Sequence, residues 1–358
     1  MALAMSKPVP AAGLEDLLER SLRDDDAPRA WLFAGFDRWI ASALVHPQDA
    51  FVVRHLLRLM AIAAFAAWAQ FHLAWWSTTA VYVAIVLNGE TIGRFLHILS
   101  HRKLFGSRFA GLNTALTWIV SPWIGEPPCL FASEHVANHH AQDNGLEDLG
   151  CTRPYQRDSW AGLGRYLLDF FVGGSGAFGL ARLFGRRRGG RVWRRRFYLG
   201  QAIFWSLVLT RLWFDWVAAV TLLIVPYLFV QAFNRANNWT EHAFINPERP
   251  DDPLGNAYTI VDSRFNTGVG YNEGYHAAHH LRPGLPNHLW PKAFRDRVED
   301  YQAADHLVFQ GTGANDIFFM LMFKNYKGLA KYYVPWPDRP RSEAEVIDLL
   351  RQRVARQV

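Results

Sequence analysis

The sequence contains few charged residues and few cysteines for its length. Charged residues make up 20% of its 358 residues, against about 25% of all residues in typical soluble proteins. The two cysteines, Cys129 and Cys151, cannot build a disulfide framework and match no spaced metal-binding motif. This scarcity excludes a disulfide scaffold and fits a reducing compartment.

A secretory signal is also missing. The first fifty residues have no apolar segment behind a basic start, and they carry Glu15, Asp16 and Glu19 instead. We therefore expect the N-terminus to stay in the compartment where it is made.

The apolar residues are plentiful and occur in blocks, although the mean hydropathy of −0.05 is that of a soluble protein. Residues 59–76 carry no formal charge and the run 77–87 follows almost without a loop, while runs 197–213 and 214–234 form a second pair. Such lengths suit membrane spans better than soluble core helices, which usually keep a polar face. We predict an all-α integral membrane fold with four transmembrane helices in two hairpins, at about 57–76, 77–98, 197–213 and 214–234.

Positive charge predicts the orientation of these helices. The hairpin tips hold one arginine between them, whereas residues 182–196 contain eight arginines and no acid. Because positive loops stay cytoplasmic, we expect both termini to face the cytoplasm, from the inner or plasma membrane if the source is bacterial. Residues 1–50 would form an N-terminal arm and 51–358 a single domain, with a cytoplasmic helical cap of residues 99–196 and 235–358. The arginines could attract anionic lipid, but no groove-reading motif predicts nucleic acid.

Two further segments have distinct patterns. Residues 111–131 are apolar but interrupted by Pro122, Glu126, Pro127 and Pro128, which favours an interfacial or re-entrant piece over a fifth span. Near the C-terminus, Ser342 and Glu345 form a capping box ahead of apolar residues at helical spacing, which predicts a surface helix.

The histidines are clustered. Windows 97–101, 135–140 and 276–280 contain eight of the fourteen histidines, and their i, i+3 and i, i+4 spacings would turn each set one way on a helix. An unbroken helix from residue 77 to 101, about 36 Å long, would cross a hydrocarbon layer of about 30 Å and place the first window just beyond it. Glu90 lies on the same stripe, where an ionisable group must face protein. With His242 beyond the fourth span, nine histidines could converge on two metal ions, and imidazole alone does not select the metal.

These motifs resemble those of the integral-membrane fatty-acid desaturase and hydroxylase superfamily, His-rich di-iron enzymes with a cytoplasmic metal cap. The resemblance rests on His97-x3-His101, Glu134-His135-x3-His139-His140 and His276-x2-His279-His280, and it covers roughly residues 55–310. Asn238-Trp-Thr-Glu-His242 is similar to a fourth element of these enzymes and to the Asn-Tyr-x-Glu-His of alkane hydroxylases.

The resemblance implies two iron ions and O2 as cofactors. Their expected ligands are His97, His101, His135, His139, His140, His242, His276, His279 and His280. Asn238 would lie close or bind through water, and Glu90, Glu134, Glu241 and Glu273 are candidates to support the ligands from outside. For Glu134, Glu241 and Glu273 a plain surface role is the alternative.

The sequence also departs from some relatives, because it has no haem domain, dinucleotide loop or Cys-rich iron–sulfur motif. Electrons must then come from an external donor, and a ferredoxin-type protein with its reductase is our hypothesis, with residues 182–196 as its docking patch. The expected substrate is a fatty acid, or a fatty-acyl lipid or thioester.

Three reaction outcomes remain open. Loss of a neighbouring hydrogen gives a desaturase, loss of a carboxyl group gives a terminal alkene, as in the 1-alkene-forming decarboxylases, and oxygen rebound gives a hydroxylase. Four spans favour desaturase-like formation of a C=C bond over the six-span alkane hydroxylases. A metal transporter would also concentrate histidines, but its ligands would lie near the membrane midplane.

Overall fold

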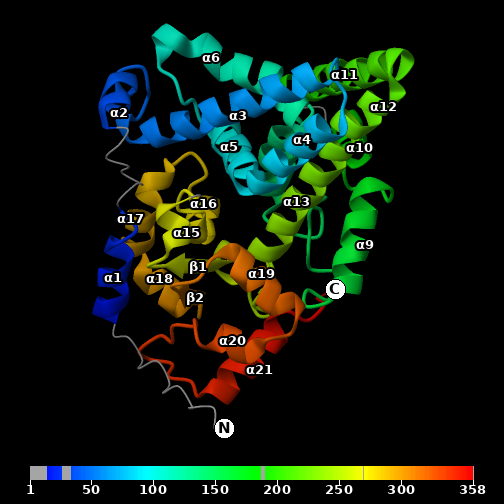
Figure 1. The fold of residues 1–358 in the computed structure, drawn as a ribbon. Helices are drawn as coiled ribbons and strands as arrows, with labels where there is room; N and C mark the ends of the chain where they lie inside the picture. Colours follow the sequence, from blue (N-terminus) through cyan, green and yellow to red (C-terminus); the bar gives the residue numbers. More distant parts are fainter. Residues whose placement is uncertain (1–13, 26–33, 187–189, 269, 358) are drawn as a thin grey trace, which may run out of the picture.

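The computed structural model describes residues 14–25, 34–186, 190–268 and 270–357, and these are mostly helical. Long apolar helices occupy one end of the molecule, and a body of short helices and two strands occupies the other (Figure 1). Residues 187–189 of the arginine-rich run, and 1–13 and 26–33 of the predicted arm, lie outside the described residues.

The first hairpin begins after helix α2 (Ala34–Ala41) and the short turn η2 (Pro47–Asp49). It consists of α3 (Ala50–Ala69), α4 (Trp75–Leu87) and α5 (Gly89–His101). The predicted continuous helix from residue 77 to 101 is therefore wrong. The break falls at Asn88, whose side-chain amide donates to the Ala84 carbonyl at 2.7 Å. Gly89 follows, where a Cβ would come within 3.3 Å of the Phe233 ring, so α5 starts packed closely against α13.

The segment between the first hairpin and the second histidine window is built from short helical pieces. They are η3 (Ser107–Phe109), α6 (Ala110–Ala115), the π-helical turn η4 (Leu116–Val120), η5 (Ser121–Ile124), α7 (Leu130–Glu134), a second π-helical turn η6 (His135–His139) and α8 (His140–Gln142). Gly125 ends η5 with φ 87°, and a Cβ there would meet the Pro226 carbonyl oxygen at 2.5 Å. No span-length helix forms in 111–131, as the prolines predicted.

The second hairpin follows α9 (Trp160–Phe171) and α10 (Ala177–Arg186). It comprises α11 (Arg191–Phe214), α12 (Trp216–Ala219), the π-helical turn η7 (Val220–Ile224) and α13 (Val225–Glu241). Asp215 forms its tip and accepts a hydrogen bond from the Ala218 N–H at 3.0 Å. Arg211 donates to the Gln70 carbonyl at 2.5 Å and lies over the Phe71 ring, so the tips of the two hairpins lie together.

Two of the four predicted spans are helices long and apolar enough to cross a membrane, Pro47–Ala69 and Trp216–Glu241. Trp75–Leu87 is apolar but shorter, and α11 begins with four arginines. Around the hairpin tips the aromatic rings of Trp75, Trp213, Phe214 and Trp216 are between 66% and 85% exposed. Exposed aromatic rings at helix ends are typical of a membrane–water interface.

The remaining chain forms the C-terminal body. Its elements are α14 (Pro253–Asn256), β1 (Tyr258–Val261), α15 (Arg264–Thr267), η8 (Glu273–Tyr275), α16 (His276–Leu281), η9 (Asn287–Leu289), α17 (Trp290–Arg295), α18 (Val298–Ala303), β2 (Leu307–Gln310), α19 (Ala314–Met322), α20 (Tyr326–Ala330) and α21 (Glu343–Arg353). The two strands pair in parallel, Tyr258 opposite Leu307, so the all-α prediction misses a small buried sheet. The capping box at Ser342 and the helix after it are confirmed.

The N-terminal helix α1 (Leu14–Leu22) packs on this body, against α17 and β1. Just after it, the buried carboxylate of Asp24 accepts hydrogen bonds from Asn266, the Tyr275 hydroxyl and the backbone N–H groups of Asp262 and Ser263. The N-terminal arm is therefore part of the packing around the segment that leads to His276.

Candidate metal centre

The nine predicted histidines come from four parts of the chain and meet between the apolar helices and the C-terminal body. His97 and His101 lie on α5, and His242 follows the last residue of α13. The second window occupies η6 and α8, and the third lies on α16. All are at least partly buried.

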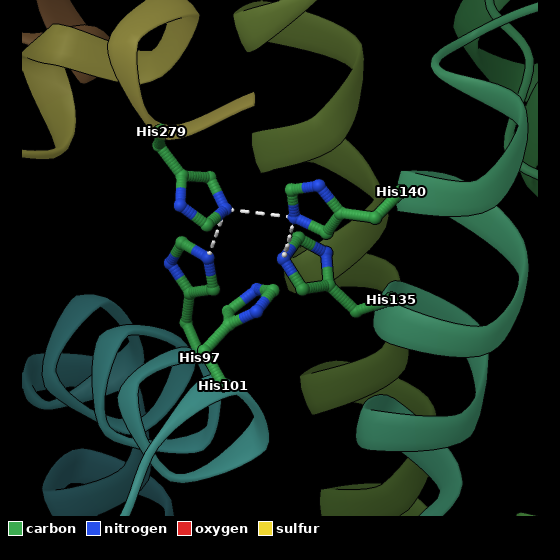
Figure 2. Close-up of side chains that lie close together, drawn as sticks. All are labelled: His97, His101, His135, His140 and His279. Carbon is green, nitrogen blue, oxygen red and sulfur yellow. Dashed lines mark hydrogen bonds between the residues drawn. The ribbon is translucent and has the colours of Figure 1, made fainter. Parts of the chain in front are cut away.

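The imidazoles form two groups, and in each the nearest ring nitrogens lie within 4.8 Å of one another. Group A is His97, His101, His135, His140 and His279, whose rings point toward one another from α5, η6, α8 and α16 (Figure 2). Group B is His139, His242, His276 and His280.

The prediction that each histidine window faces one way is wrong for the second and third windows. His135 belongs to group A, whereas His139, four residues later, belongs to group B. The two residues span the π-helical turn η6, whose wider turn separates side chains that an α-helix would align. In the third window His276 and His280 share group B, and His279 faces group A. The elements η6–α8 and α16 thus contribute to both groups.

Outer partners fix the orientation of several rings. His139 Nδ1 lies 2.6 Å from Asp148, and His280 Nδ1 lies 2.5 Å from Asp143. His242 Nδ1 lies 2.8 Å from the backbone carbonyl of Asn256, and His97 Nδ1 contacts Glu273. An imidazole that donates its Nδ1–H outward presents an unprotonated Nε2, which is the form that binds a metal ion.

The Nε2 atoms face one another inside each group. In group B, His242 Nε2 lies 3.2 Å from His139 Nε2 and 3.2 Å from His276 Nε2. In group A, His279 Nε2 lies 2.8 Å from both His97 Nε2 and His140 Nε2. Because the Nδ1 atoms of His139 and His242 both face outer acceptors, their Nε2 atoms are left to bind a cation between them. Imidazole ligands bind at about 2.0–2.1 Å, so these nitrogens are spaced as neighbouring ligands would be, and the donor set fits two metal ions.

Burial and charge set the protonation of the cluster. Burial lowers the pKa of most of these imidazoles, among them those of His135, His140, His242, His279 and His280. Burial also opposes protonation of His139, but the adjacent Asp148 carboxylate outweighs it and raises the pKa of that ring. Most of the cluster therefore stays neutral, as metal binding requires.

Three of the predicted carboxylates gather around one buried arginine. Arg94 on α5 lies 2.7 Å from Glu241, 3.3 Å from Glu90 and 3.5 Å from Glu273. Glu273 also contacts His97, and Glu241 lies 3.8 Å from His276 Nε2. The sequence places Arg94 one turn after Glu90 on the same helical stripe, but it did not indicate the role of Arg94 in binding the other two carboxylates.

Glu134 and Asn238 occupy other positions. Glu134 pairs with Arg235 of α13, and no hydrogen bond joins its carboxylate to a histidine in the described part of the chain. Asn238 donates to the Gly150 carbonyl at 2.9 Å and to the Tyr166 hydroxyl at 2.8 Å. Both side chains therefore stabilise the segments around the second histidine window.

Sequence reasoning missed three of the outer partners. Asp143 and Asp148 follow the second window within ten residues, and an acid so close after a histidine box was the available signal. The Asn256 partner is a backbone carbonyl, so it has no signal in the sequence. His288, which the boxes exclude, lies beside His46 with ring centroids 5.7 Å apart and outside both groups.

The family model for fatty acid desaturases matches residues 73–312, which is more than half of the chain. The chain belongs to the fatty acid desaturase family. No curated protein and no solved structure matches it. As a member of this family the protein is an oxidoreductase, and its two histidine groups and apolar helices fit a metal-dependent membrane enzyme.

Proposed function

We propose that the protein is an O2-dependent membrane di-iron oxidase that removes hydrogen from a fatty-acyl chain to form a C=C bond. The observation that carries the proposal is the pair of histidine groups, in which nine imidazoles converge and several Nε2 atoms face one another at 2.8–3.2 Å. Family membership supports an acyl substrate.

Two bound iron ions would supply the activation of O2 that breaking a methylene C–H bond requires. We propose the nine histidines as their ligands, five in group A and four in group B. The protein's own contribution is to hold these imidazoles neutral and oriented. Asp143, Asp148, Glu273 and the Asn256 carbonyl each hold one ring by its outer nitrogen.

The membrane arrangement is part of the same proposal. We propose that both hairpins cross the bilayer, with their aromatic tips at the far interface and the histidine groups at the cytoplasmic side. The two candidate spans and the exposed aromatic tips support it. Electrons would come from a ferredoxin-type donor and its reductase, since the sequence carries no haem or iron–sulfur motif of its own.

The test is to express the chain with a ferredoxin and its reductase, supply isotopically labelled fatty acids, and analyse headspace and lipid extract by mass spectrometry. A new internal double bond, or a terminal alkene one carbon shorter than the substrate, supports the proposal. A hydroxylated acid as the main product would instead identify the protein as a hydroxylase. Purified protein that holds no iron and turns over no acyl substrate would overturn it in favour of another metal-dependent role such as transport.

A further inference from the structure

A surface cleft of about 360 Å³ reaches the metal centre from the side of the apolar helices. It lies between the end of α5, the α6–η4 segment, α7 and the start of α11. His101 of group A forms part of its wall, and the indoles of Trp118 and Trp193 line it. The cleft thus joins the protein surface to one of the proposed iron ligands.

The lining of this cleft is positively charged. Arg102, Lys103 and Arg196 line it, and none of the described residues that line it is acidic. Arg102 is neutralised by Asp49, which it contacts through both terminal nitrogens. Lys103 and Arg196 are exposed and have no acidic partner anywhere in the described residues. Two uncompensated cations beside one small cleft favour an anion.

The same cleft has an apolar side. Leu99 lines it and packs against the hydrophobic cluster of the first hairpin. A ligand that fills the cleft therefore needs an anionic end for Lys103 and Arg196 and an apolar end for the indoles and Leu99. A fatty acid combines the two.

We propose that this cleft binds the anionic head group of the acyl substrate, a carboxylate paired with Lys103 and Arg196 beside His101. The inference rests on the proposed function, which supplies the acyl substrate. It adds that the substrate is a free acid and that Lys103 and Arg196 select it. A phospholipid phosphate has the same charge, so the experiment separates the two sources.

Equilibrium binding of radiolabelled palmitate to the iron-loaded protein in phosphatidylcholine nanodiscs tests the site. Two partly exposed charge-assisted contacts are together worth about a tenfold change in affinity, so K103A/R196A should bind palmitate about tenfold more weakly. Uncharged methyl palmitate should bind both proteins equally. K327A/K331A is the matched control, since it removes two exposed lysines of the C-terminal body and should bind palmitate as the unmodified protein does.

Phosphatidylglycerol in the nanodiscs identifies the source of the anion. Palmitate binding that persists when the nanodiscs contain an equal amount of phosphatidylglycerol supports a substrate site. Loss of phosphatidylglycerol binding alone in K103A/R196A would overturn the inference in favour of a lipid site, as would unchanged palmitate affinity. K103R/R196K, which keeps both charges, should restore binding and so exclude a folding defect.

Turnover separates this inference from the proposed function. In an active protein, K103A/R196A should raise KM for palmitate with little change in kcat or iron content. Turnover unaffected by K103A/R196A would show that the cleft is not the head-group site, and it would leave the proposed function intact. Palmitate binding that depends on Lys103 and Arg196, without turnover of any acyl chain, would support the cleft as a carboxylate site but would overturn the proposed function.

Discussion

Arg94 donates to Glu241 at 2.7 Å across 147 residues of sequence. The contact joins α5 to the end of α13, and Glu90 and Glu273 complete the surroundings of the same guanidinium. One cation thus faces three carboxylates, two of which also lie beside histidines of the candidate metal centre.

Replacing this arginine should be strongly destabilising. Arg94→Leu would leave buried carboxylates without their cation, at a cost of about 3–5 kcal/mol. We expect a clearly lower unfolding temperature in detergent and loss of bound iron. Arg165→Ala, which removes an arginine that is 73% exposed and lies 3.9 Å from Asp169, should change stability little. Equal unfolding temperatures for the two variants would contradict the role given to Arg94.

Removing one histidine from each group tests the proposed ligands. His139→Ala takes a ring from group B and His279→Ala one from group A, and each should abolish turnover. Because each group supplies its own ion in the proposal, each variant should lose iron, measured per chain by elemental analysis. His72→Ala removes an exposed histidine and should keep full iron content; retained turnover in either ligand variant would refute the assignment.

Asp148 should matter through its contact with His139, although its other carboxylate oxygen also accepts hydrogen bonds from the Asn138 amide and the Gly150 N–H. Asp148→Asn keeps the shape but loses the charge that orients the ring, and losses of outer partners typically cost about 10–100-fold in metal affinity or activity. Iron retention during titration with a chelator measures the effect. The neighbouring Glu147 is exposed, so Glu147→Gln should behave like the unmodified protein, and an equal loss in both variants would count against orientation of the ring.

The pH dependence of stability has a separate source in His306. This fully buried ring bonds to the Leu254 carbonyl and the Thr259 hydroxyl, and burial lowers its pKa to about 4. The imidazole binds a proton near pH 6.5 in the unfolded chain but only near pH 4 in the folded chain. The free energy of unfolding therefore falls as pH drops from about 6.5 to about 4, by about 3 kcal/mol at most.

The pH effect is measured as a difference between variants. His306→Gln removes the titrating group, so its unfolding temperature should fall less between pH 7 and pH 5 than that of the unmodified protein. His72→Gln keeps the buried ring and should follow the unmodified protein. Parallel curves for all three proteins would exclude His306 as the source.

The sequence predicted which histidines converge but could not assign them to groups. His97 and His101 follow simple helical spacing and do share group A. His135 and His139 do not, because a π-helical turn depends on backbone hydrogen bonds that residue spacing does not encode. Pairing of β1 with β2, and the contact of Asp24 with Tyr275 across 251 residues, depend on tertiary packing and were equally out of reach of local patterns.

The helix break at Asn88 shows the same limit within one predicted span. Residues 77–98 fit a single span by hydropathy, and the break at Asn88 coincides with the close approach of Phe233 to Gly89. Hydropathy therefore locates the apolar segment but does not reveal the break within it.

The order of the ligand-bearing elements along the chain has a consequence for how the enzyme is made. Group A needs His279 and group B needs three residues beyond α13, so both groups stay incomplete until α16 has been synthesised. By then both hairpins have been synthesised. Under the proposed function neither group can offer its full set of iron ligands before both hairpins exist, so a chain truncated before α16 should bind no iron.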